Sequence, residues 1–306
     1  MAAQLATAYS SRFIGVGVIA AGPYYCAGTY PALTPLQNAT ATCMSPVNAA
    51  VGPLPAVSLS NARYFAHRDW IDDVEYLARQ RVYVFSGTND QTVKPLVAAT
   101  VPTYYSLAQT PPANIVYRHD VNAGHAIIVN NPQAVPCSTT HSPYINNCGF
   151  EQSQELLAHI YPGSTAPATN RQGKIVSFDQ AEFVKGRRSS MDQTAYAYIP
   201  ADCEQGGCKV HVALHGCQQG AAVLGDRFYN GTGYNQYADT NRTIVLYPQA
   251  VPSNGIPFNP KGCWDFWGYS DDNPAQRTFY TRNAPQMAAI VAMLDRLGQP
   301  LAAARP

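Results

Sequence analysis

The chain has 306 residues, 46% of them hydrophobic, so it can bury the core of one large α/β domain or two smaller ones. Lys and Arg number 20 against 19 Asp and Glu, and this balance argues against nucleic acid or an anionic membrane as the partner. Only 13% of the residues are charged, which is typical of a secreted protein acting on neutral substrates. No apolar run reaches the ~20 residues of a membrane span.

Hydrophobic spacing predicts alternating helices and strands along the chain. The first half is expected to hold helices at 1–10, 69–79 and 151–161, strands at 13–20, 82–85 and 115–117, and a loop at 24–60. Residues 162–169 are rich in Pro, Gly, Ser, Thr and Ala and form the best linker candidate. The second half is expected to hold strands at 195–199, 210–214 and 243–247, and helices at 235–239 and 287–297. This alternation predicts a mostly parallel sheet flanked by helices.

An acid and a histidine follow two successive predicted strands. Asp90 comes soon after the run Val82–Phe85, and His125 follows the run that ends at Tyr117. α/β-hydrolases place the second and third members of a Ser-Asp-His triad on such turns, in this order. Alone, Asp90 could be a turn residue and His125 a buried structural histidine. Together they favour the catalytic interpretation.

The nucleophile of such a triad sits in a Gly-x-Ser-x-Gly elbow, and the sequence contains no such pentapeptide. The chain starts at Met1, already inside an apolar, helix-like run, and has no recognisable signal peptide. Ser10 and Ser11 lie too far along the predicted helix to serve as the nucleophile. We expect that the chain is truncated at its N-terminus, and that the strand and elbow carrying the serine precede Met1.

The eight cysteines allow 105 disulfide connectivities, or they could be free core residues. Several lie close together in polar loops, which favours disulfides and an oxidising compartment. We expect the pairs Cys26–Cys43, Cys137–Cys148, Cys203–Cys208 and Cys217–Cys263. No zinc site is expected, because no C-x-x-C pair occurs and the His211–His215 spacing falls on a strand.

Two segments of the second half carry candidate binding residues. The His215-Gly216-Cys217 turn follows a buried strand, where α/β-hydrolases place a backbone N–H of the oxyanion hole, so Cys217 is the candidate donor. The alternative is a strand-end turn that needs a small residue. The segment 262–268 gathers two Trp and one Phe, and Trp264 is the best candidate for a substrate-lining side chain. A satellite hydrophobic cluster explains this segment equally well.

The order of these elements is unusual. In most α/β-hydrolases the oxyanion turn precedes the serine elbow, whereas here it follows both Asp90 and His125. Circular permutation of one domain accounts for this order, because chain termini often lie close together. We therefore expect a single catalytic domain over 1–306, with permuted halves at 1–161 and 170–306 and a linker at about 162–169.

The chain resembles the secreted polyhydroxybutyrate (PHB) depolymerases of the fungal, circularly permuted, single-domain type. The residues that carry the resemblance are Met1–Leu5, Ser86–Asp90, Gly124–His125, Ser142–Ile145, Val212–Cys217, Tyr247–Ala250, Gly262–Asp265 and Gln286–Val291. In that family the elbow resembles Gly-x-Ser-x-Gly-Gly-Tyr and runs into Met-Ala-Ala-Gln-Leu. The resemblance implies a serine about five residues before Met1.

By this resemblance, Asp90 is the triad acid, His125 the general base, Cys217 an oxyanion-hole residue and Trp264 a substrate-binding residue. The implied protein is a secreted, monomeric serine esterase that hydrolyses poly(3-hydroxybutyrate) and its oligomers, with no metal or organic cofactor. The alternatives are a feruloyl or acetyl carbohydrate esterase and a non-catalytic polymer-binding homologue. Without the serine and its central strand, the 306-residue chain itself is expected to be inactive and poorly stable.

Overall fold

The computed structural model describes residues 1–273 and 275–298. They divide into two compact units. The first comprises Met1–Pro162 and Asp265–Ala284, and the second comprises Gly163–Trp264 and the chain from Pro285 onward. The break after Pro162 falls at the start of the predicted linker. The single-domain organisation stays a prediction.

The first unit is built on a three-stranded parallel sheet. Its strands β1 (Gly15–Ile19), β2 (Arg81–Phe85) and β3 (Ile115–Arg118) lie in the order β1-β2-β3. β2 is central and almost wholly buried, which explains its continuous apolar sequence. The three strands predicted for this half are confirmed.

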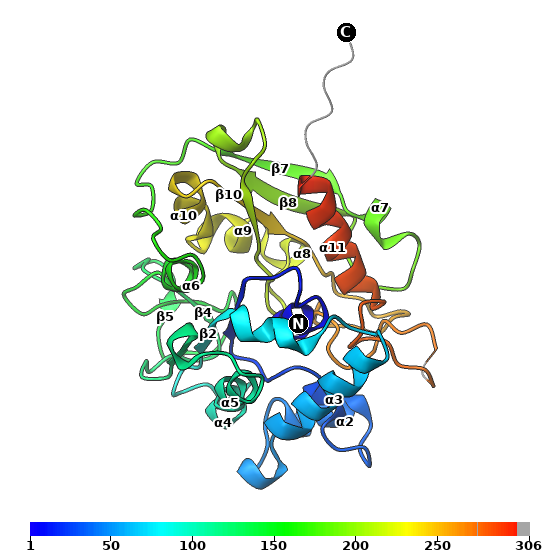
Figure 1. The fold of residues 1–306 in the computed structure, drawn as a ribbon. Helices are drawn as coiled ribbons and strands as arrows, with labels where there is room; N and C mark the ends of the chain where they lie inside the picture. The colour runs from blue at the N-terminus through cyan, green and yellow to red at the C-terminus, as the bar shows by residue number, and fades with distance from the viewer. Residues whose placement is uncertain (274, 299–306) are drawn as a thin grey trace. The chain divides into compact units, whose positions relative to one another are not determined.

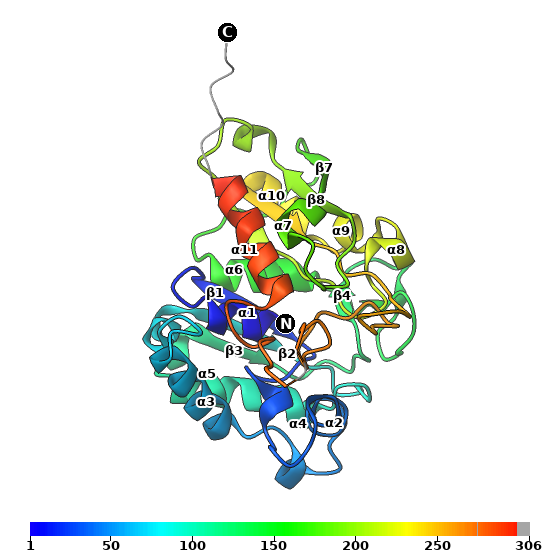
Figure 2. The same cartoon turned by 90° about the vertical axis from the view of Figure 1, so that its right-hand side faces the viewer.

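Helices cover both faces of this sheet. α6 (Gln152–Ile160) lies over one face, and α5 (Thr100–Leu107) lies under the other (Figure 2). α1 (Ala2–Ala8) packs against β1 and meets α5 through a contact of 3.2 Å between the hydroxyls of Thr7 and Tyr104. Parallel strands covered by helices confirm the α/β class.

Two glycines let α6 approach β1 closely. A Cβ atom on Gly17 would lie 2.0 Å from Cδ1 of Leu156, and one on Gly15 would lie 2.9 Å from Cγ2 of Ile160. Both distances are shorter than van der Waals contact allows. The Gly-x-Gly pattern of this strand is therefore required for helix packing.

The region between β1 and β2 differs from the prediction. The expected loop at 24–60 holds several short helices and the start of α3 (Pro55–His67), which begins with Pro55 at its first position. The expected helix at 69–79 is confined to the 3₁₀ helix Val74–Arg79, because Asp69 has a positive φ of 55° and Asp73 has a non-helical ψ of 131°. Asp73 caps the shorter helix by accepting a hydrogen bond from the backbone N–H of Glu75.

A second, very small parallel sheet of the first unit was not predicted. β4 (Ile127–Val129) and β5 (Val135–Pro136) flank β6 (Ile145–Asn147) in the order β4-β6-β5. Strands of two or three residues leave too little alternation to be recognised in a sequence.

The second unit contains a mixed sheet with the order β7-β8-β10-β9. Its strands are β7 (Lys174–Asp179), β8 (Thr194–Ile199), β9 (Lys209–Val212) and β10 (Thr243–Tyr247). Only β9 and β10 are parallel, and β8 is antiparallel to both of its neighbours. The expectation of a mostly parallel sheet is wrong for this unit, because β8 runs antiparallel both to β10 and to β7, a strand that was not predicted.

Two longer helices pack on this sheet. α10 (Tyr234–Thr240) contacts β8 and β10, whereas α11 (Pro285–Gly298) contacts β9 and runs beside α7 (Ala181–Val184) (Figure 1).

The remaining short helices of the described chain are Cys26–Gly28, Pro35–Gln37, Asn38–Thr42, Ala49–Val51, Pro95–Ala98, Pro112–Asn114, Ala201–Cys203, Ala221–Leu224 and Arg227–Gly231.

All four expected disulfides are present, and the structure leaves no cysteine free. Three of them close loops of 5 to 17 residues, and Cys217–Cys263 joins two more distant loops of the second unit.

Within the described residues, none of the helices has the length and apolar character that a membrane crossing requires.

Candidate active site

Asp90 and His125 meet at the carboxyl ends of β2 and β3. The Asp90 side chain is fully buried, and its Oδ1 accepts hydrogen bonds of 2.9 Å from the backbone N–H groups of Thr92 and Val93. Its Oδ2 lies 2.8 Å from Nδ1 of His125. Three donors thus surround one buried carboxylate and provide the hydrogen bonds that a buried acid requires.

The orientation of His125 leaves its second ring nitrogen, Nε2, able to accept a proton. Asp90 holds the Nδ1–H, so the neutral imidazole presents an unprotonated Nε2. The side chain of His125 is 28% exposed, in contrast to the buried acid. The pair therefore has the arrangement in which an acid orients a base that a nucleophile can reach.

Direct backbone contacts hold the two turns together. The N–H of Thr88 donates to the carbonyl of Val121 at 2.9 Å, and the N–H of Asn89 donates to that of Ala123 at 3.1 Å. A Cβ atom on Gly87 would lie 2.2 Å from the Ala123 carbonyl oxygen. Glycine at position 87 is therefore needed for the close approach that lets the acid reach the histidine.

No serine is paired with His125 in the part of the chain that the structure describes. Its hydrogen bonds go to Asp90 and, from its backbone, to Thr140. Ser10 donates to the Asp73 carbonyl, and Ser11 bonds to the carboxylate of Asp72. Both serines precede β1, at the opposite end of the sheet from the acid and the histidine, so neither is placed as the nucleophile.

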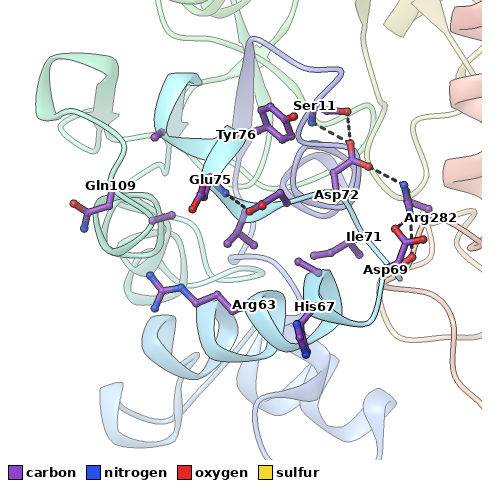
Figure 3. Close-up of a pocket in the computed structure, with 15 residues that line it drawn as sticks. Ser11, Arg63, His67, Asp69, Ile71, Asp72, Glu75, Tyr76, Gln109 and Arg282 are labelled. Atoms are coloured by element: carbon purple, nitrogen blue, oxygen red, sulfur yellow. Dashed lines mark hydrogen bonds and ion pairs between the residues drawn. The ribbon is translucent and has the colours of Figure 1, made fainter.

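A pocket of the first unit lies at that opposite end of the sheet. Figure 3 shows Ser11, Asp72 and Arg282 on one wall and Arg63 and His67 on α3. Its volume is about 860 Å³, and its lining is rich in charged residues. Because its lining includes residues that precede β1 and β2, it is separate from the site of the acid–histidine pair.

In the second unit, the turn after β9 is held by His215. This side chain is buried, its Nδ1–H donates to the Gly216 carbonyl at 2.7 Å, and its Nε2 accepts from the N–H of Ala250 at 3.0 Å. Burial lowers the pKa of His215 to about 4, so the ring is neutral at pH 7. His215 therefore supports the turn and cannot act as an independent acid near neutral pH.

The backbone N–H of Cys217 has no hydrogen-bond partner among the described residues. The neighbouring amides are all engaged: Gly216 donates to Gln219 Oε1 at 2.7 Å, and Gln218 donates to the Lys261 carbonyl at 2.7 Å. Cys217 is exposed, and its disulfide to Cys263 fixes the turn. A rigid turn with one free, accessible donor is what an oxyanion site requires.

Trp264 offers a second unused donor in the same unit. Its side chain is 5% exposed, and its indole Nε1–H is buried without a hydrogen-bond partner in the described structure. The indole lies against the His215 ring, with centroids 5.2 Å apart. A buried N–H without a partner is unfavourable, so a ligand oxygen or a water molecule would stabilise this site.

The structure therefore brings the predicted residues together in two groups. Asp90 and His125 form one group in the first unit, and Cys217, Cys263 and Trp264 form another in the second unit. Sequence reasoning missed Asn89 and Thr140, which contact the loops of the first group. Asn89 stands beside Asp90 and looks like an ordinary turn residue, and nothing in the sequence links Thr140 to His125.

One group of possible metal ligands occurs in the described residues, formed by Asp202, Cys203 and Cys208. The two cysteines form a disulfide, so they carry no thiolate to bind a metal. Nothing in this group fits a metal centre.

Comparisons with known proteins identify relatives that match nearly the whole chain. The chain is 39% identical over 304 residues to a poly(3-hydroxybutyrate) depolymerase of Delftia acidovorans, covering 97% of this chain but only 57% of the relative. It is 34% identical over 311 residues to a polyhydroxybutyrate depolymerase of Talaromyces funiculosus, covering 97% of this chain and 86% of the relative. No family model matches the chain.

Two solved structures share the fold. The crystal structure of a PHB depolymerase from Penicillium funiculosum has a TM-score of 0.83 at 32% identity, and covers 97% of this chain and 91% of its own. A serine-to-alanine variant of a PHB depolymerase, complexed with an R3HB trimer, has a TM-score of 0.84 with the same identity and coverage.

Proposed function

We propose, because the chain belongs to the polyhydroxybutyrate depolymerase family, that it hydrolyses the ester bonds of poly(3-hydroxybutyrate) and its oligomers. The observation that carries this proposal is the 2.8 Å contact between Asp90 Oδ2 and His125 Nδ1. The four disulfides support secretion, since such bonds persist in oxidising compartments. The polymer or its oligomer is the partner we propose, and no metal or organic cofactor is required.

The proposed reaction is acyl transfer in two steps. His125 Nε2 takes the proton of a serine hydroxyl as this attacks the ester carbonyl, and Asp90 stabilises the imidazolium that forms. His125 then gives the proton to the departing alcohol. Water, activated by His125, hydrolyses the acyl-serine and regenerates the free hydroxyl.

We also propose that this serine is encoded upstream of Met1, in an elbow that runs into α1. One feature of the sheet supports this position. β1 pairs with only β2 among the described strands, so its other edge can accept the strand that precedes an elbow.

Cys217 is the proposed oxyanion donor, because its free N–H is held on a disulfide-fixed turn. The position of this turn after Asp90 and His125 in the sequence supports a circularly permuted arrangement of the α/β-hydrolase elements. Trp264 is the proposed substrate-binding residue, since its indole N–H lacks a partner.

Replacing Trp264 with phenylalanine tests that role. In the complete gene product, Trp264→Phe keeps an aromatic side chain but removes the N–H, so we expect KM for hydroxybutyrate oligomers to rise about 5- to 10-fold, as loss of one hydrogen bond predicts. Steady-state kinetics on soluble trimers measures this effect. Trp70→Phe is the control, because Trp70 is 36% exposed and lies in a separate aromatic cluster. An unchanged KM in Trp264→Phe would refute a hydrogen bond from Trp264 to the substrate.

Substrate comparison separates the proposal from its alternatives. The complete gene product should hydrolyse (R)-3-hydroxybutyrate oligomers far faster than feruloyl or acetyl sugar esters, with liquid chromatography of the released acids as the measurement. Faster release of ferulate or acetate would favour a carbohydrate esterase. Binding of the polymer without any hydrolysis would favour a non-catalytic homologue.

A further inference from the structure

We propose that the disulfide-closed loop 137–148 is a clamp that positions the catalytic pair, with Thr140 and Asn89 as its positioning residues. The proposal deepens the function proposed above and rests on it. It assigns a role to a loop that contributes no reacting group. It also gives a reason for a disulfide, Cys137–Cys148, that closes a loop of only 11 residues.

The clamp bonds directly to the backbone of the histidine loop. The N–H of His125 donates to the Thr140 hydroxyl at 2.9 Å, and the N–H of Gly124 donates to the Cys137 carbonyl at 2.9 Å. A Cβ atom on Gly124 would lie 2.1 Å from the Thr139 carbonyl oxygen, so the two loops are in backbone contact. The position of His125 is therefore set by the clamp as well as by β3.

The clamp also bonds to the loop that carries the acid. Nδ2 of Asn89 donates to the Ser138 carbonyl at 2.7 Å, and the N–H of Asn89 donates to the Ala123 carbonyl at 3.1 Å. One residue next to Asp90 thus joins the acid loop to both the histidine loop and the clamp. The distance between Asp90 and His125 depends on these shared contacts.

Asn146 and the disulfide hold the clamp in shape. Asn146 is fully buried, and its Nδ2 donates to the carbonyls of Cys137 at 2.9 Å and Thr139 at 2.7 Å. The Cys137 carbonyl therefore accepts from both Asn146 and Gly124. Bonds that converge on a closed loop restrict the motion of His125, and displacement of a catalytic group by ~1 Å can lower a rate about 100-fold.

Substitution of Thr140 tests the clamp with little risk to folding, because this side chain is exposed. Thr140→Val keeps the shape and removes the hydroxyl that accepts from His125, whereas Thr140→Ser keeps the hydroxyl. In the complete gene product we expect kcat on hydroxybutyrate trimers to fall about 10-fold in Thr140→Val, with KM within about twofold of wild type. Thr140→Ser should restore kcat. Thr40→Val, at another exposed threonine whose hydroxyl bonds the backbone, should leave both constants unchanged.

The Nδ1–H signal of His125 in proton–nitrogen NMR supplies a readout that needs no catalysis. The signal is identified by its loss in His125→Gln and is to be recorded in the complete gene product. We expect Thr140→Val to shift or broaden it and Thr140→Ser to preserve it, because the hydrogen bond to Asp90 depends on the position of the ring. A clamp that serves only stability would leave the signal unchanged in folded protein.

Removal of the disulfide supplies the second variant. Cys137→Ser with Cys148→Ser should disturb the same signal, whereas Cys203→Ser with Cys208→Ser, which opens a similarly short loop of the second unit, should not. A wild-type His125 signal in both Thr140→Val and the first double variant would overturn the proposal. If the wild-type gene product hydrolyses no ester, the proposed function fails, while the NMR comparison still decides whether the clamp positions the pair.

Discussion

Replacing His125 with alanine in the complete gene product is expected to lower kcat on hydroxybutyrate oligomers by about 10⁵-fold, as loss of the general base does in serine hydrolases. Asp90→Asn should lower kcat about 10⁴-fold, because the amide cannot hold the Nδ1–H tautomer that leaves Nε2 free. Both expected losses of kcat are inferred from the 2.8 Å contact between Oδ2 of Asp90 and Nδ1 of His125. KM should change little, since neither side chain is proposed to bind the polymer.

Matched variants separate catalysis from folding. Asp120→Asn alters an acid whose side chain is 73% exposed, and His67→Ala alters an exposed histidine of α3. Both should keep wild-type kcat. Thermal melting should show that His125→Ala remains folded, because its side chain is partly exposed. A His125→Ala enzyme with more than about a tenth of wild-type kcat would refute the role of this residue as the base.

The 306-residue chain on its own is expected to hydrolyse no ester above background, whereas the same chain extended upstream through the proposed elbow is expected to be active. The reason is chemical: acyl transfer by this pair needs a hydroxyl within reach of His125 Nε2, and no serine of the described chain is bonded to it. Release of hydroxybutyrate from trimers, followed over several hours, measures both activities.

The extension should also raise stability. A strand that pairs with the open edge of β1 would satisfy its backbone groups. Thermal melting should therefore give a higher Tm for the extended chain. Hydrolysis by the unextended chain, abolished by His125→Ala, would show that the nucleophile lies within residues 1–306.

The candidate site was predictable where its signals are local. Asp90 and His125 lie on the loops that follow two successive strands, and the cysteines lie in polar loops, so their positions along the chain indicated their partners. α3 and β7 were missed because their sequences are mixed in polarity. Packing against other elements, and not the local pattern, makes them regular.

The contacts that hold the site were not predictable, because they join residues distant in sequence. The hydroxyl of Thr140 meets the N–H of His125 across 15 positions, and Asn89 meets Ser138 across 49. The free N–H of Cys217 likewise becomes visible only when the partners of its neighbours are known. Such contacts depend on the tertiary structure, and the spacing of hydrophobic residues along the sequence does not predict them.

The most direct test of the account is to map where an alkyl phosphonate ester, which reacts with activated serines, becomes attached in the complete gene product. We expect one adduct, on a serine about five residues before Met1 within a Gly-x-Ser-x-Gly sequence, found by mass spectrometry of the digested protein. The adduct should be lost in His125→Ala. An adduct on a serine within residues 1–306, or none in a protein that hydrolyses the polymer, would contradict the proposed mechanism.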